Sequence, residues 1–150
     1  MSSNEKEPVL LTTETRICIR RPSNIPLIYV IGPFTASMNW EIQQNVHEAE
    51  QLAHKIALMG GMPVCPHTNS RNFHGFQTPQ FWYAGTARML EVCDVAVTLP
   101  TWEASKGSRD EVRDARLRGQ AIFHFPEDDS KLLAWIEGFI NPSLPETYSL

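Results

Sequence analysis

Short apolar segments alternate along this chain with longer segments of helical periodicity, and this alternation limits the folds that are open to it. The clearest apolar segment is LIYVIG, residues 27–32, a β-branched run that Gly32 and Pro33 close. Such a continuous run is typical of a strand buried on both faces of a sheet. Further short strands are predicted for the segments MPVCP, DVAVTLP and AIFHF.

Four helical segments lie between and after these strands. In the first, apolar residues recur at spacings of three and four, which is the period of an amphipathic helix. In the second, Thr78 followed by Pro79 is a typical helix start. The four predicted helices cover residues 40–59, 78–92, 107–118 and 128–140.

Regular alternation of strand and helix implies right-handed crossovers and a parallel sheet. The predicted fold is therefore α/β, a three-layer flavodoxin-like or Rossmann-like parallel sheet with helices on both faces. Residues 27–150 are predicted to form this one domain, and residues 1–26 a polar N-terminal appendage in which only RICI, residues 16–19, has the pattern of an edge strand.

Composition restricts the classes of partner. The net charge of −4 argues against a nucleic-acid surface, which needs clustered lysine and arginine, so a small-molecule partner is favoured. Cys18, Cys65 and Cys93 have neither disulfide-framework nor zinc-site spacing, and no metal or cofactor is predicted. No signal-peptide pattern opens the sequence and no apolar run approaches the roughly 18 residues of a membrane span, which favours a cytoplasmic protein.

In open parallel sheets, ligands bind outside the carboxyl ends of the strands. Asp94 begins its strand, at the opposite end, and is predicted to cap or brace the fold. The candidate site residues follow the strands: Gly32, Pro33 and Phe34 after the first, residues 67–69 after the second, residues 101–108 after the third and Phe125 after the fourth.

The segment WEASKGSRDE, residues 102–111, carries the strongest chemical signal. Ser105, Gly107 and Ser108 lie where the third strand hands over to a helix, so hydroxyls and free backbone N–H groups converge at a positive dipole end that suits an anion such as phosphate. Glu111 follows one turn later, and the dipole is expected to favour its ionised form, as a nucleophile needs. The alternative is that Glu111 only stabilises the helix dipole, beside arginines that form a solvated face.

Three motifs carry a resemblance to a known superfamily. They are IYVIGP at residues 28–33, CDVAVTLP at residues 93–100 and WEASKGSRDEVRDA at residues 102–115. In order and spacing they resemble the nucleoside 2-deoxyribosyltransferases and the related 2'-deoxynucleoside 5'-monophosphate N-glycosidases. The resemblance spans roughly residues 27–125 and implies the same α/β fold.

The resemblance implies a role for each matching residue. Glu111 would be the nucleophile that attacks the anomeric carbon, and Tyr29 the hydroxyl that orients it. At the position of Ser105 the similar monophosphate hydrolases carry a serine that can meet phosphate, whereas the transferases commonly carry an acidic residue. Ser105 therefore resembles the hydrolases. The implied activity is cleavage of the N-glycosidic bond of a nucleoside 5'-monophosphate; the alternative is transfer of the sugar between bases. Beside these, the predicted substrate-binding residues are Gly32, Pro33, Phe34, His67, Trp102, Gly107 and Ser108, with Trp82 as a further candidate for stacking on the base.

The sequence departs from the similar enzymes at one position, which leaves open both the proton donor and whether the chain is catalytic. The similar enzymes carry an aspartate in the helix before the third strand, and residues 76–90 contain no carboxylate. Candidates to protonate the departing base are His67, His74 and Glu103. A non-catalytic nucleotide sensor is the alternative from another class.

A second alternative is an interaction surface on the last helix, made by Trp135, Ile136 and Phe139, although packing in the core is the more common use of such a stripe. The resemblance also implies a homodimer or larger assembly.

Overall fold

The computed structural model describes residues 24–73 and 75–142 as one α/β unit. The predicted strands and helices in this part of the chain are confirmed, with ends that differ by up to two residues. RICI, Cys18 and His74 lie outside the described residues. The elements are β1 (Leu27–Ile31), α2 (Asn39–Leu58), β2 (Met62–Val64), α3 (Pro66–Asn69), α4 (Pro79–Val92), β3 (Val95–Thr98), the 3-10 turn η2 (Trp102–Ala104), α5 (Lys106–Leu117), β4 (Ala121–His124) and α6 (Asp129–Ile140).

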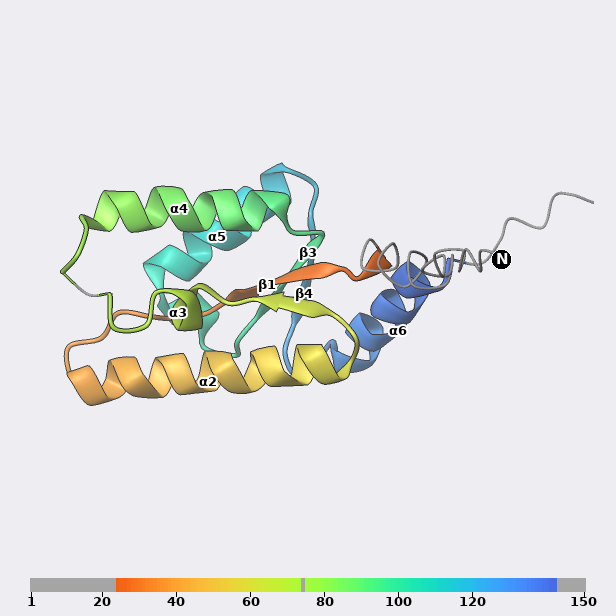
Figure 1. Cartoon of the computed structure of the whole chain (residues 1–150), viewed down its shortest axis with the longest axis horizontal. Coiled ribbons are helices and arrows are strands. Elements are labelled where there is room, and N and C mark those ends of the chain that lie inside the picture. The colour runs from red at the N-terminus through yellow and green to blue at the C-terminus, as the bar shows by residue number, and fades with distance from the viewer. Residues whose placement is uncertain (1–23, 74, 143–150) are drawn as a thin grey trace, which may run out of the picture.

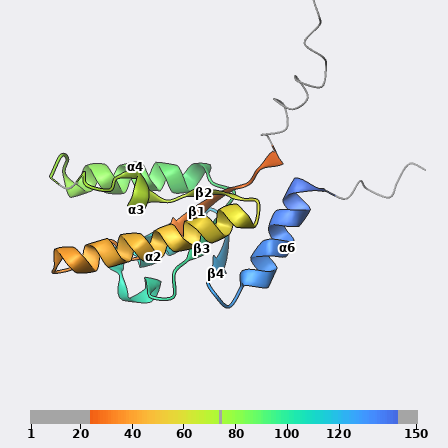
Figure 2. The same ribbon diagram turned by 60° about the horizontal axis from the view of Figure 1, so that its bottom comes forward.

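The four strands form one parallel sheet in the order β2-β1-β3-β4, and their labels follow that order in Figure 2. Helices α4 and α5 cover one face of this sheet, while α2 and α6 pack on the other (Figure 1). This is the predicted three-layer, flavodoxin-like α/β fold.

Strand β1 divides its side chains between the two faces, because successive residues of a strand point to opposite sides. Ile28 and Val30 pack with apolar residues of α2 and α6. Tyr29 and Ile31 pack with Leu90 of α4 and with residues of α5. All four are fully buried, so the central strand supplies both layers of the core.

The starts of α4 and α5 are fixed by side-chain caps. The hydroxyl of Thr78 accepts a hydrogen bond from the N–H of Phe81 at 3.3 Å. The hydroxyl of Ser105 accepts one from the N–H of Ser108, also at 3.3 Å. Each cap satisfies a backbone donor that the first turn of a helix leaves free, and so sets where the helix begins at the carboxyl edge of the sheet.

The opposite edge of the sheet is braced by Asp94, as predicted. Its Oδ2 accepts a hydrogen bond of 2.7 Å from the N–H of Leu27, at the amino end of β1. This contact ties β1 to β3 far from the carboxyl edge where the candidate site residues lie.

The interaction surface considered for α6 is not supported. Ile136 is fully buried, and Trp135 packs against the same core cluster as Ile28 and Val30. The ring of Phe139 contacts Trp135 with centroids 5.2 Å apart. Helix α6 therefore turns its aromatic stripe to the sheet rather than to a partner. Among the described residues, no helix is long and apolar enough to cross a membrane.

Candidate functional site

A cavity of about 650 Å³ opens at the carboxyl edge of the sheet, between α4 and α5. The loop after β1, the short helix α3 and the loop that follows it close its other sides. The residues that line it from α5 and its N-cap are Ser105, Gly107, Ser108, Asp110, Glu111, Arg113 and Asp114; those from α4 are Pro79, Trp82, Tyr83, Thr86, Ala87 and Leu90.

Glu111 and Tyr29 form the best-defined contact in this region. The Tyr29 hydroxyl donates a hydrogen bond of 2.6 Å to Oε1 of Glu111. Tyr29 is fully buried beneath the cavity, whereas Glu111 lines it. A short bond from a buried ring fixes one carboxylate oxygen of a side chain that lines the cavity.

Burial changes the protonation of Glu111. Removal from water raises the pKa of this carboxyl to about 7, assisted by the nearby charge of Asp114, while the bond from Tyr29 lowers it. The helix dipole is expected to favour the ionised form of Glu111, whereas burial favours the protonated form and raises the pKa. Near neutral pH the side chain is poised to act as a nucleophile or to exchange a proton.

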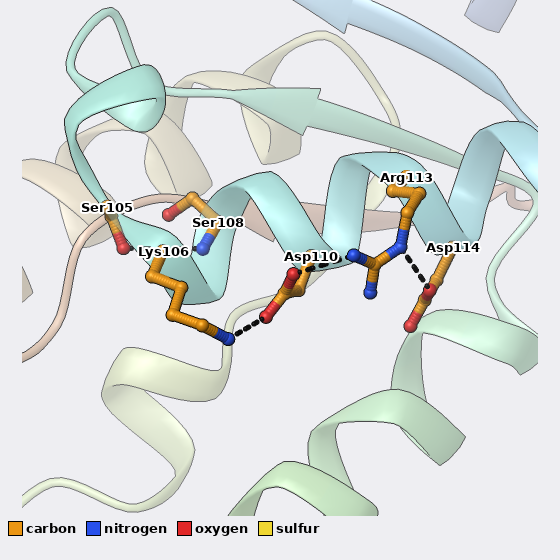
Figure 3. A network of polar contacts seen from close by, with 6 residues as sticks. All are labelled: Ser105, Lys106, Ser108, Asp110, Arg113 and Asp114. Atoms are coloured by element: carbon orange, nitrogen blue, oxygen red, sulfur yellow. Dashed lines mark hydrogen bonds and ion pairs between the residues drawn. The ribbon is translucent and has the colours of Figure 1, made fainter.

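The two serines at the start of α5 have different surroundings (Figure 3). The Ser105 hydroxyl is engaged in the cap, where it accepts from the N–H of Ser108. The Ser108 hydroxyl is buried and has no hydrogen-bond partner among the described residues, although the residue lines the cavity. The predicted convergence of Ser105, Gly107 and Ser108 at one end of the cavity is thus present, with one hydroxyl already used.

Three further charged residues of α5 line the cavity, and none of them was predicted as a site residue. They are Asp110, Arg113 and Asp114. Arg113 lines the cavity although its side chain is 63% exposed, and it pairs with Asp110 at 3.0 Å and with Asp114 at 3.6 Å. Lys106 completes the chain of ion pairs at 2.8 Å from Asp110 (Figure 3). Asp110 and Asp114 could have been predicted from the helical period, because residues 107, 110, 111 and 114 share one face of a helix.

His67 is placed at the cavity, but its ring is committed to the backbone. Its Nε2 lies 3.0 Å from the carbonyl oxygen of Gly32 and 3.1 Å from that of Pro33, so this nitrogen carries the proton and donates to both. Burial lowers the pKa of the imidazole, which keeps it neutral. His67 therefore holds the loop after β1 in place and is poorly suited to protonate a leaving group.

Aromatic rings surround the mouth of the cavity. Phe34, Phe73, Trp82 and Tyr83 line it, and the rings of Phe73 and Trp82 lie 6.1 Å apart between centroids. Phe73 and Tyr83 are still about half exposed or more, at 48% and 63%. Flat apolar faces of this kind suit a flat, partly apolar ligand.

Trp102 is not brought to this cavity, contrary to its prediction as a substrate-binding residue. The η2 turn directs it toward β4, where its ring stacks on His124 at 5.6 Å and lines a second, separate cavity of about 410 Å³. Glu103, considered as a proton donor, lines that second cavity as well. Among the described residues no cluster of three or more histidine, cysteine, aspartate or glutamate side chains is arranged to hold a metal ion.

Comparisons with known proteins bear on the family and the fold. Residues 26–125 match the family model described as "Domain of unknown function (DUF7768)". No curated protein matches the sequence. A solved structure of a 2-deoxyribosyltransferase from the psychrotolerant bacterium Bacillus psychrosaccharolyticus is similar over 65% of this chain and 70% of that chain, with 17% identity and a TM-score of 0.49. Similarity at this level leaves the activity of the present chain to be argued from its own residues.

Proposed function

The chain belongs to the DUF7768 family, whose description assigns no function, and we propose that it hydrolyses the N-glycosidic bond of nucleoside or 2'-deoxynucleoside 5'-monophosphates. The observation that carries the proposal is the hydrogen bond of 2.6 Å from the Tyr29 hydroxyl to Glu111 at the floor of the cavity. The resemblance implies a glycosyl-accepting carboxylate and a hydroxyl that orients it, and this contact supports giving those roles to Glu111 and Tyr29.

The proposed reaction is a double displacement at the anomeric carbon. The ionised Glu111 carboxylate attacks that carbon, the bond to the base nitrogen breaks, and the base departs with the electron pair and takes up a proton. Water then attacks the same carbon and releases Glu111, so that the sugar retains its configuration. A pKa near 7 makes Glu111 half ionised at neutral pH, which leaves enough carboxylate for attack.

The start of α5 supports a phosphate on the substrate. The first turn of a helix leaves backbone N–H groups without helical partners, and in α5 the Ser105 hydroxyl takes up that of Ser108 while Gly107 lies at the edge of the cavity. Ser105 at the cap adds no negative charge that would repel a phosphate dianion. The resemblance also supports a phosphorylated substrate, because the similar monophosphate hydrolases carry a serine at the position of Ser105.

The aromatic mouth supports a heterocyclic base at the other end of the substrate. Phe34, Trp82 and the neighbouring rings present π faces on which a base can stack. The proposed contacts of the substrate with the loop after β1 come from Gly32 and Phe34, while His67 and Pro33 act by shaping that loop.

The same first step serves a deoxyribosyltransferase if a second base replaces water as the acceptor.

The test is chromatographic detection of free base after incubation with a panel of ribo- and deoxynucleoside 5'-monophosphates and their unphosphorylated counterparts, with and without an added acceptor base. Release from monophosphates is expected, with loss of at least about 1,000-fold in kcat for Glu111→Gln.

The matched control is Glu137→Gln, which makes the same chemical change at an exposed position on α6, on the other face of the sheet. This variant should release base at the wild-type rate. If no compound yields free base or an exchanged nucleoside, the enzyme proposal fails for these substrates, and nucleotide binding without turnover becomes the leading alternative. Size-exclusion chromatography on the same samples tests the homo-oligomer that the resemblance implies.

A further inference from the structure

The second step of the proposed double displacement needs a proton acceptor. Water attacks the anomeric carbon while the bond from that carbon to Glu111 breaks, and the water must lose a proton to a base as it does so. Glu111 cannot be that base, because its carboxylate is the group that the same step releases. A second basic group that reaches the cavity is therefore required.

Two candidates near Glu111 are unsuited to this task. The Nε2 of His67 donates to two backbone carbonyls, and its other ring nitrogen faces the buried thiol of Cys65 at 4.0 Å. Asp110 lines the cavity, but it is paired with Lys106 at 2.8 Å and with Arg113 at 3.0 Å. The contact with Lys106 above all holds the pKa of Asp110 below its usual value, which makes this carboxylate a poor proton acceptor.

Asp114 is the carboxylate that these contacts leave available. It lines the cavity from α5, and its side chain is 41% exposed. Its ion-pair contact is with the Nε of Arg113 at 3.6 Å, which is longer than either ion pair of Asp110 (Figure 3). A carboxylate in this position can accept a proton at the cavity and release it to solvent.

Asp114 lies one turn of α5 beyond Glu111. Side chains three residues apart on a helix are neighbours, with Cβ atoms about 5–6 Å apart. Burial is the main cause of the raised pKa of Glu111, and the charge of Asp114 adds to it, so the two carboxyl groups are electrostatically coupled. Retaining enzymes that cleave glycosidic bonds hold a nucleophile and an acid/base carboxyl about 5–5.5 Å apart, a separation that this helical spacing permits.

We propose that Asp114 is the general base of the second step and takes a proton from the water that attacks the anomeric carbon. The water oxygen forms its bond to that carbon, the bond from the carbon to the Glu111 carboxylate breaks with its electron pair returning to Glu111, and the proton moves to Asp114. The exposed part of the side chain then returns the proton to solvent before the next turnover. This assignment rests on the proposed function and names the residue that activates water within it.

The test measures the first turnover separately from later ones in Asp114→Ala, by rapid mixing with the monophosphate that releases base fastest from the wild-type protein. The variant should release about one equivalent of base at the wild-type rate and then slow by about 100-fold or more, because only the second step needs the general base. Mass spectrometry should find the sugar phosphate bound to Glu111. Asp114→Asn, which nearly preserves the side-chain shape, should give the same burst and the same adduct.

The matched control is Asp110→Ala, which removes the other aspartate that lines the cavity from α5. Its steady-state rate should stay within about fivefold of the wild type, as expected when an ion pair near the surface is lost. Melting curves of all variants by circular dichroism show that they are folded.

Azide distinguishes a missing base from a damaged site. Azide attacks as an anion and needs no base to remove a proton, and the truncated side chain of Asp114→Ala leaves room for it. Added azide should raise the turnover of this variant by about tenfold or more and give a sugar azide that retains the configuration of the substrate. The wild-type rate should not respond.

Three results overturn the assignment while the proposed function stands. They are wild-type turnover by Asp114→Ala without azide, a first turnover slowed as much as the later ones with no rescue by azide, and an equal loss of turnover in Asp110→Ala. If the wild-type protein releases no base from any monophosphate, the proposed function fails and the assignment of Asp114 falls with it.

Discussion

The two faces of the sheet differ in what they bury. On the side of α2 and α6, Ile28 and Val30 pack in a cluster of buried apolar residues. On the side of α4 and α5, the same strand presents Tyr29, whose hydroxyl reaches Glu111. There the two helices leave a cavity of about 650 Å³ at the carboxyl edge.

Because the side chains of β1 alternate between the two faces, one face contributes mainly to stability and the other carries the candidate site. The closed face gains from every apolar atom removed from water. The open face keeps a carboxyl whose pKa burial raises to about 7 and the Ser108 hydroxyl, which has no partner among the described residues; both cost stability. Removing an apolar side chain from the closed face should therefore lower the free energy of unfolding, whereas removing the buried carboxyl from the open face should raise it.

The largest effect on stability is expected on the closed face. Ile136 is fully buried in α6, so Ile136→Ala leaves a cavity and should lower the free energy of unfolding by about 2–5 kcal/mol. Chemical denaturation monitored by circular dichroism measures this loss. Activity per folded molecule should stay at the wild-type value; a change in the pH dependence of base release would contradict the division between the faces.

Glu111→Gln should stabilise the protein, by an amount that depends on pH. The folded pKa of about 7 lies above the ordinary value of 4.5, so the native state favours the proton, and this contribution to stability is present below pH 4.5 and lost as pH rises through 7. Glutamine cannot ionise, so the variant should exceed the wild type by about 3 kcal/mol at pH 8 and by little at pH 4. Denaturant titrations at the two pH values measure the difference, and an equal effect at both would show that burial does not control this carboxyl.

Tyr29→Phe should have the smallest effect, because it removes one hydrogen bond and no packing volume. That bond lowers the pKa of Glu111, so its loss should move the acid limb of the profile of kcat/KM against pH upward by about one unit. Near pH 6 the rate should fall about tenfold, and much of the loss should be recovered at pH 9, where Glu111 is ionised in both proteins. An acid limb that does not move would assign Tyr29 to packing alone.

The layers could be predicted from the sequence because their signals are local. Buried β-branched runs mark β1 and β3, and Thr78 with Pro79 marks the start of α4. Helix α3 was not predicted, because four residues are too few for a helical period to be visible.

The site could be predicted only where position along a strand or helix decides the outcome. Ser105, Gly107, Ser108 and Glu111 are brought to one cavity by the crossover from β3 to α5. Trp102 was misplaced because a 3-10 turn, which no residue pattern announced, directs it to the second cavity. The protonation of Glu111 depends on burial by distant elements, and such burial has no local signal.

The raised pKa of Glu111 also gives this carboxyl a distinctive reactivity toward reagents. Diazo compounds esterify a carboxylic acid that still holds its proton and do not react with carboxylates. At pH 6 they should therefore select Glu111 over a partly exposed side chain such as Asp110, whose pKa Lys106 holds low. Mass spectrometry would locate the ester, and a ligand in the cavity would protect against it. The state of the site can thus be read by chemical labelling before any substrate is known.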